Sequence, residues 1–225
     1  RHLMFVPELQ LNGLTPQQFL DEYWQKKPCL IRQGLPGLDF PLSPNELAGL
    51  ACDPEVPSRI LTEVGGDLGW SLEHGPFDET RFSELPEQGW TLLVSDLEKH
   101  VPVTQALIEP FRFIPDWRID DLMISYAVEG GSVGPHWDDY DVFLVQVAGS
   151  REWQVDTTAY GDEDLLPNPD LKILSRFDTE DSWVLQPGDI LYLPPRVAHH
   201  GIARDNDCMT CSVGFRAPAW SDMLT

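Results

Sequence analysis

Basic residues are scarce in this sequence. Its 225 residues contain 15 lysines and arginines against 37 aspartates and glutamates, which gives a formal net charge of −22. Such an excess of negative charge repels a phosphate backbone, so we expect no direct nucleic-acid binding by this domain. The same charge would attract a basic partner protein.

Long hydrophobic runs are absent as well. No apolar segment approaches the roughly 18–20 residues that a membrane-spanning helix needs. No secretory leader is visible in the first residues of the sequence. We therefore expect no membrane association and a cytoplasmic location.

Cysteine is also rare, with Cys29, Cys52, Cys208 and Cys211 as the whole set. The last two have the spacing of a metal-binding motif, but no second such pair exists to complete a zinc site. Residues three apart on a strand point to opposite faces, so Cys208 and Cys211 should not converge. We expect four reduced thiols, as is usual in a cytosolic protein.

Proline and glycine are abundant by contrast, with 20 and 17 residues. Capping boxes at 15–18 and 43–46, each with proline at the first helical position, predict two helices, and Ser95 could cap a third. From residue 117 the pattern changes to turns, including a hairpin turn at 129–132, and to short strands at 118–128, 134–147, 152–155, 182–185, 190–193 and 209–215. Helices followed by strands predict a mainly β fold, an antiparallel barrel or sandwich with N-terminal helices packed outside.

A candidate metal site lies in the strand-rich half. His136 and Asp138 are two residues apart, so on a strand they would face the same side. His199 follows a short apolar strand and a proline pair, and is the expected third ligand. Two histidines and one carboxylate on one face of an ion are typical of non-haem Fe(II) oxygenases. His200 stays open as the rival third ligand.

Several motifs carry a family resemblance. They are Gly-Pro-His-x-Asp at 134–138, Gly-Asp-x-Leu-Tyr-Leu-Pro-Pro at 188–195 with the following His199, and the stretches 115–125, 138–143 and 212–218. With these motifs the chain resembles the JmjC-type 2-oxoglutarate oxygenases, which have a double-stranded β-helix fold. The closer resemblance is to the bacterial ribosomal oxygenases, which hydroxylate an arginine of a large-subunit ribosomal protein.

The resemblance implies a domain plan. Residues 1–114 would be N-terminal helices and strands packing on the core, and 115–218 the JmjC double-stranded β-helix, which is jelly-roll or cupin-like. Residues 219–225 would begin a linker to a dimerisation region and a winged-helix-like region, both absent here, so a homodimer could form through those regions. Two positions depart from the family pattern: Arg196 stands where glycine is usual, and His200 follows the distal histidine.

The resemblance also implies the cofactors: Fe(II), with 2-oxoglutarate as cosubstrate and O₂. It assigns Arg151 to the distal carboxylate of 2-oxoglutarate, which suits a bidentate guanidinium. On the last strand, Met209, Cys211, Val213 and Phe215 form an apolar face, so the hydroxyls of Thr210 and Ser212 should face the interior beside that carboxylate. A solvated arginine at a strand end is the alternative for Arg151.

Strand alternation also predicts a substrate wall. Asp121, Met123 and Ser125 lie opposite an apolar face, and Tyr140 shares its side with His136 and Asp138. A carboxylate beside an aromatic ring suits a guanidinium, and the resemblance assigns this wall to the target arginine of a basic ribosomal protein. The alternatives are a structural acid for Asp121 and a core aromatic for Tyr140.

Three other functions remain open. A JmjC lysine demethylase would use the same iron centre with a methyl-ammonium pocket. An asparagine or histidine hydroxylase would need groups that recognise an amide or imidazole in place of Asp121. A non-catalytic metal-binding cupin would have no need for Arg151.

Overall fold

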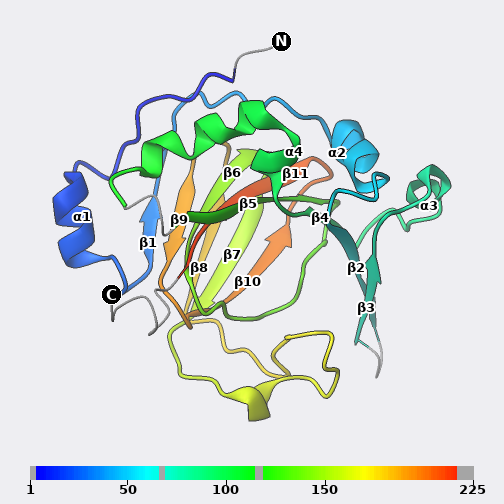
Figure 1. The fold of residues 1–225 in the computed structure, drawn as a ribbon. Coiled ribbons are helices and arrows are strands. Elements are labelled where there is room, and N and C mark those ends of the chain that lie inside the picture. The colour runs from blue at the N-terminus through cyan, green and yellow to red at the C-terminus, as the bar shows by residue number, and fades with distance from the viewer. Residues whose placement is uncertain (1–3, 66–68, 115–118, 217–225) are drawn as a thin grey trace, which may run out of the picture.

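The computed structural model describes residues 4–65, 69–114 and 119–216 (Figure 1). The expected linker 219–225 and the residues 115–118 at the expected start of the core lie outside these ranges. None of the described helices is long and apolar enough to cross a membrane.

The N-terminal half mixes short helices and strands. In chain order they are α1 (Pro16–Glu22), β1 (Cys29–Ile31), α2 (Pro44–Ala51), β2 (Ser58–Gly65), β3 (Gly69–His74), α3 (Glu79–Ser83), β4 (Trp90–Val94), α4 (Leu97–His100), η2 (Pro102–Leu107) and η3 (Glu109–Phe111). Both predicted capping boxes are confirmed, since the Thr15 and Ser43 side chains accept from the backbone N–H three residues on. The Ser95 cap is wrong: Asp96 precedes α4 in a left-handed conformation, and no side chain in the described ranges caps this helix.

The C-terminal half is mainly strands. They are β5 (Ile119–Ala127), β6 (Asp141–Ala148), β7 (Arg151–Asp156), β8 (Asp181–Leu185), β9 (Ile190–Leu193), β10 (Ala198–Ala203) and β11 (Cys208–Phe215), with η5 (Asp162–Asp164) between β7 and β8. The chain as described is mainly β with flanking helices, which confirms the predicted fold class.

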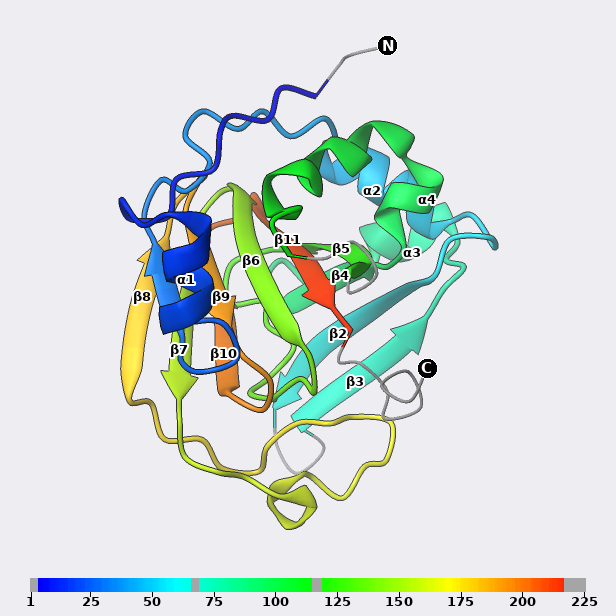
Figure 2. The ribbon, with the colours of Figure 1, turned by 60° about the vertical axis from the view of Figure 1, so that its left-hand side comes forward.

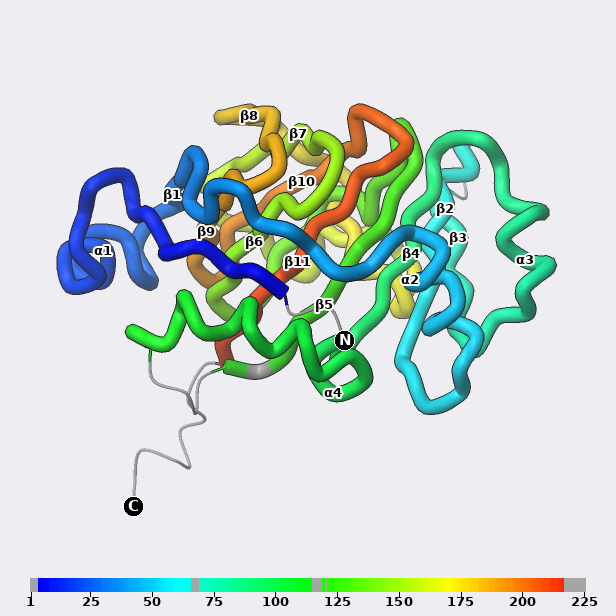
Figure 3. The backbone as a smooth tube through the Cα atoms, turned by 90° about the horizontal axis from the view of Figure 1, so that it is seen from above, coloured from blue at the N-terminus to red at the C-terminus, as the bar shows by residue number. Residues whose placement is uncertain are grey.

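Two antiparallel sheets build the fold. The larger has the order β1-β9-β6-β11-β5-β4-β2-β3 and the smaller the order β10-β7-β8. Figure 2 shows β7, β8 and β10 grouped on one side and the β2–β3 hairpin on the other. Viewed from above, the smaller sheet, the larger sheet and the helical stretch that begins at α4 form three successive layers (Figure 3).

Side chains along β6 point alternately into two hydrophobic cores, one on each face of the larger sheet. Phe143 and Val145 point to the helix side, where they join Phe19, Phe111 and other buried side chains in the main core. Val142 and Leu144 point between the sheets and pack with Trp153 and its neighbours. Period-two patterning therefore leaves one face of the larger sheet for the helices and the other for the space between the sheets.

Three details of the predicted strands are wrong. The strand predicted at 134–147 begins at Asp141, because Gly134 has a φ of +78° and Pro135 cannot donate to a ladder. The turn near 129–132 is not a hairpin, since β11 lies between β5 and β6 in the larger sheet. Three strands were not predicted at all: β2, β3 and β10, the last of which carries His199.

The four cysteines are free thiols, as predicted. Cys208 packs with Ala127 and Ala203, whereas Cys211 lies in the main core on the other face of β11. The two side chains therefore do not converge.

Candidate active site

The first two residues of the candidate metal site lie on a loop, 134–140, instead of a strand. His136 forms an isolated antiparallel bridge with His199 of β10, with N–O distances of 3.0 and 2.8 Å. This bridge adds the loop to the edge of the smaller sheet. Gly134 is needed for the loop, because a Cβ there would lie 2.9 Å from Ile173 Cγ2 and the φ is positive.

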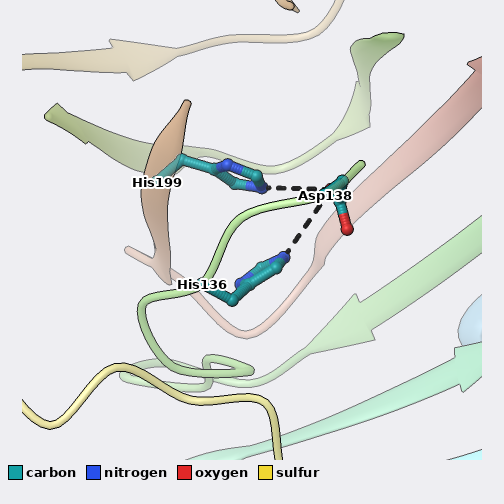
Figure 4. Close-up of side chains that lie close together, drawn as sticks. All are labelled: His136, Asp138 and His199. Atoms are coloured by element: carbon teal, nitrogen blue, oxygen red, sulfur yellow. Dashed lines mark ion pairs between the residues drawn. The ribbon is translucent and has the colours of Figure 1, made fainter. Parts of the chain in front are cut away.

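The His136, Asp138 and His199 side chains converge (Figure 4). The Asp138 Oδ2 lies 3.9 Å from His136 Nε2 and 3.5 Å from His199 Nε2. One ligand atom of each residue lies within 4.8 Å of the others. Among the residues that the structure describes, this is the one group of histidine, cysteine or acidic side chains that could hold a metal ion.

Backbone carbonyls orient both imidazoles. The Nδ1 atoms of His136 and His199 lie 2.9 Å from the carbonyl oxygens of Gly134 and Val197. A carbonyl only accepts, so a proton on Nδ1 of each ring satisfies these contacts and leaves Nε2 facing the metal site. Burial, and to a smaller extent the neighbouring His136, lower the pKa of His199 to about 4, although the negative charge of Asp138 acts to raise it. The ring of His199 is therefore neutral at pH 7.

His200 does not join this group. It follows His199 on β10 and so faces the opposite side of the smaller sheet, where its ring meets Phe177 edge-on at 6.0 Å. Burial, with the charges of His136 and Arg151, lowers the pKa of His200 to about 4. Of the two adjacent histidines, His199 therefore belongs to the candidate metal site and His200 does not.

Arg151 is buried at the start of β7, with 3% of its surface exposed. Its Nε donates to Thr210 Oγ1 at 3.0 Å, and the Thr210 hydroxyl donates to Gln146 Oε1 at 2.9 Å. The Arg151 Nη2 is buried and has no hydrogen-bond partner among the residues that the structure describes. Since a buried guanidinium donor without a partner is costly, the side chain is arranged to receive an acceptor.

One cavity of about 360 Å³ between the sheets joins these groups. His136, Asp138, His199 and Arg151 all line it. Thr210 and Ser212 line it too, on the face opposite Met209 and Cys211, as strand alternation predicts. Ser125 on β5 also lines the cavity, and its hydroxyl donates to the backbone oxygen of Thr210 at 3.3 Å.

Part of the predicted substrate wall lines the same cavity, but Asp121 is not among the lining residues. Met123 and Tyr140 line it, and Tyr140 is 37% exposed at its mouth. Asp121 lies beside Tyr140: a Cβ added at Gly214 would meet Tyr140 Cε2 at 3.4 Å and Asp121 Oδ1 at 3.6 Å. Burial first, and then the charges of Asp138 and Asp121, raise the pKa of Tyr140, so its hydroxyl is protonated at neutral pH.

Part of the cavity wall was not predicted from the sequence. Arg59 from β2, Thr91 and Leu93 from β4, and Leu171 to Ile173 from the loop after β7 all line it. The last segment could have been noticed, because Leu171 and Ile173 alternate with polar residues within an otherwise polar loop. Nothing in the sequence indicated that β2 and β4 reach this cavity, since that depends on the pairing of β2 with β4 and of β4 with β5.

Arg196, at the position for which the resemblance implies glycine, has a φ of +65°. Its backbone N–H donates to Asp138 O at 2.7 Å, and its guanidinium pairs with Asp139 at 3.0 Å and lies 5.0 Å from the Trp137 ring centre. These contacts bind the loop of Asp138 to the residues before β10. They offset the backbone cost of a side chain in the left-handed region.

The donor set suits a divalent transition metal. Two imidazole Nε2 atoms with fixed tautomers and one carboxylate converge from one side, and the cavity leaves the other side open. This is the ligand pattern of non-haem iron sites. The unpartnered Arg151 Nη2, in the same cavity, suits an anionic ligand.

Comparisons with known proteins identify relatives of the chain. Ribosomal protein uL16 3-hydroxylase of Escherichia coli (strain K12) is 44% identical over 218 residues, which cover 97% of this chain and 57% of the relative. A probable ribosomal oxygenase of Haemophilus influenzae is 42% identical over 212 residues, which cover 94% of this chain and 52% of the relative. The chain thus spans a little over half the length of these relatives.

The solved structures agree. The structure of YcfD, a ribosomal oxygenase from Escherichia coli, in complex with cobalt and 2-oxoglutarate matches with a TM-score of 0.82 and 43% identity over 96% of this chain and 55% of that chain. This likeness confirms the predicted JmjC fold class. The family model described as JmjC domain matches residues 106–223, more than half of the sequence. The chain therefore belongs to the JmjC domain family.

Proposed function

We propose that this chain is the catalytic part of an Fe(II)- and 2-oxoglutarate-dependent protein hydroxylase. Its substrate is an arginine side chain of a large-subunit ribosomal protein. The observation that carries the proposal is the convergence of His136, Asp138 and His199 in one cavity with the buried, unpartnered donor of Arg151. The names of the relatives, a uL16 3-hydroxylase and a probable ribosomal oxygenase, support the substrate class.

His136, Asp138 and His199 would hold the Fe(II). When bound, the iron with 2-oxoglutarate and O₂ supplies the oxidising power for C–H hydroxylation, with succinate and CO₂ as the other products. The chain itself fixes the two imidazoles through the Gly134 and Val197 carbonyls, so no reorientation is needed when the metal binds. The cobalt in the related structure supports a divalent metal in this site.

Arg151 would hold the distal carboxylate of 2-oxoglutarate. Thr210 keeps the guanidinium in place by accepting from Nε, which leaves Nη2 for the ligand. Ser212 and Ser125 add hydroxyls on the same wall, and Ser125 fits the cosubstrate better than the target side chain because it lies against Thr210. The apolar Leu144 and Trp153 beside them exclude water from this end of the cavity.

Asp121, Met123 and Tyr140 would bind the target arginine. The carboxylate of Asp121 pairs with a guanidinium fork, and the aromatic face of Tyr140 accepts its flat side. The mouth of the cavity, where Tyr140 is exposed, lets a side chain enter from outside and reach the metal. The role of these groups is to position one methylene of the substrate beside the iron.

The setting fits a cytoplasmic enzyme with a basic protein substrate. All four cysteines are free thiols, as the reducing cytoplasm favours. The net charge of −22 favours capture of a basic ribosomal protein and disfavours direct binding of nucleic acid.

A mass measurement tests the proposal. The iron-loaded protein is incubated with 2-oxoglutarate and arginine-containing peptides of uL16, and a gain of about 16 mass units on arginine is expected. A loss of about 14 on a methyl-lysine peptide would instead indicate a demethylase. A gain on asparagine or histidine would indicate another hydroxylase, and metal binding without consumption of 2-oxoglutarate would indicate a non-catalytic cupin.

A further inference from the structure

Three buried side-chain atoms lack a hydrogen-bond partner within residues 4–65, 69–114 and 119–216. They are Thr91 Oγ1, Arg151 Nη2 and Trp153 Nε1. All three residues line the same cavity. Native proteins rarely leave buried polar atoms unpaired, so three in one cavity indicate a ligand that pairs with them.

Thr91 has no evident structural reason to be a threonine. Its side chain is fully buried on β4, and its neighbours on that strand are Trp90 and Leu92, both buried and apolar. A buried hydroxyl without a partner costs stability relative to the methyl group of valine, which has nearly the same shape. The hydroxyl is therefore placed to pair with a ligand that enters the cavity.

The strand registers locate Thr91 at the Arg151 end of the cavity. Thr91 pairs with Ala127 of β5, and Ala127 pairs with Cys208 of β11. Ala127 and Cys208 pack against Ala203, which pairs with Arg151 of β7. Thr91 and Arg151 are thus at the same level of the fold, on opposite sheets.

We propose that the Thr91 hydroxyl donates a hydrogen bond to the distal carboxylate of 2-oxoglutarate, which receives Arg151 Nη2 from the other sheet. This inference rests on the proposed function. A carboxylate has two oxygens and about four acceptor positions, so one guanidinium nitrogen does not satisfy it. The hydroxyl of Thr91 fills one of the remaining positions from the wall of the larger sheet.

The test compares Thr91→Val, which keeps the shape and removes the hydroxyl, with Thr91→Ser, which keeps the hydroxyl. Calorimetry measures the dissociation constant for 2-oxoglutarate in the Mn(II)-loaded full chain without oxygen. Loss of a hydrogen bond to a charged group should raise the dissociation constant of Thr91→Val about tenfold or more. Thr91→Ser should stay close to wild type.

Thr104→Val is the matched control. Thr104 is also fully buried, but its hydroxyl donates to Val101 O at 2.7 Å in the helical layer, and it does not line the cavity. Thr104→Val should lower the melting temperature and leave 2-oxoglutarate binding unchanged. Thr91→Val should do the reverse: its melting temperature without ligand should equal or exceed that of wild type, because an unpaired buried hydroxyl is removed.

Three results would overturn the inference. They are wild-type affinity for 2-oxoglutarate in Thr91→Val, a clear loss of ligand-free stability in that variant, or an equal loss of affinity for 2-oxobutanoate, which lacks the distal carboxylate. An effect confined to 2-oxoglutarate supports it. If the wild-type protein with metal does not bind 2-oxoglutarate at all, the proposed function fails before the role of Thr91 is reached.

Discussion

His136 and His199 are 63 positions apart in the sequence, yet each donates its backbone N–H to the carbonyl of the other, at 3.0 and 2.8 Å. Their ring centres lie 4.3 Å apart. The bridge between the 134–140 loop and β10 therefore sets the spacing of the two imidazoles before any metal binds. Such preorganisation lowers the cost of assembling a metal site.

Removal of one ligand should abolish metal binding without unfolding the protein. In His136→Ala the ring is lost while its backbone bridge to His199 is kept, so we expect no Fe(II) binding and no succinate formation, with an unchanged circular dichroism spectrum. His200→Ala is the control, because that ring lies on the other face of β10. A stronger effect in His200→Ala than in His136→Ala would contradict the ligand assignment.

Removal of the buried cation should weaken 2-oxoglutarate binding. Loss of a charge-assisted pair in a buried site costs on the order of 2–5 kcal/mol, so in Arg151→Ala the KM for 2-oxoglutarate should rise at least about thirtyfold. The KM of Arg151→Lys should lie between those of the wild type and Arg151→Ala, because lysine keeps the charge and loses the planar fork. The exposed Arg176→Ala is the control, and an Arg151→Ala enzyme with the wild-type KM would refute the assignment.

Sequence alternation predicted correctly which face of β11 lines the cavity, for a physical reason. β11 lies between β5 and β6, with one face on the helices and the other on the cavity, so its alternation of Thr210 and Ser212 with Cys211 and Val213 is enforced on both sides. The 134–140 loop has no such constraint. Its two metal-site residues converge because of Gly134, Pro135 and the bridge to β10, and strand parity is not the cause.

The pairing of strands that lie far apart in the chain could not be predicted from the sequence. The position of β11 between β5 and β6, and the extension of the sheet through β4 to β2 and β3, depend on contacts between segments far apart in the chain. For that reason Thr91 and Arg59 were not recognised as cavity residues.

Substitution of Asp121 should slow hydroxylation of the peptide without stopping the turnover of 2-oxoglutarate that occurs without peptide. Asp121→Asn keeps the shape and removes the charge that we propose pairs with the target guanidinium, so peptide hydroxylation should fall strongly while Fe(II) binding and slow turnover of 2-oxoglutarate without peptide persist. Both activities must be measured on one preparation. Wild-type hydroxylation of an arginine peptide by Asp121→Asn, or equal activity on a lysine peptide, would rule out the arginine pocket.

Acid stability should depend on Asp189, which anchors the start of β9. Burial alone would raise its pKa, but hydrogen bonds from the Gln186 and Gln33 backbones and from Arg32 outweigh burial and hold the pKa below its ordinary value. Asp189 then binds a proton less readily in the folded protein than in the unfolded chain. Its contribution to the free energy of unfolding is therefore complete above the ordinary pKa of about 3.9, and it is lost as the pH falls through the lower pKa of the folded protein.

Asp189→Asn should therefore lower the free energy of unfolding at pH 7 by roughly 1–3 kcal/mol, because two backbone donors lose their charged acceptor. Below pH 4 the difference from wild type should shrink. Urea unfolding between pH 3 and 7, with the exposed Asp21→Asn as control, measures both effects. A difference that is constant with pH would exclude the linkage.

The central claim is that one oxygen atom of O₂ enters a peptide at the His136, Asp138 and His199 site while the other enters succinate. Mass spectrometry of a reaction under ¹⁸O₂ in ordinary water, with an arginine peptide of uL16, tests it directly. We expect the peptide to gain about 18 mass units, succinate to carry one ¹⁸O, and both products to be absent with His136→Ala. A gain of about 16 units, or labelled peptide without succinate, would contradict the account.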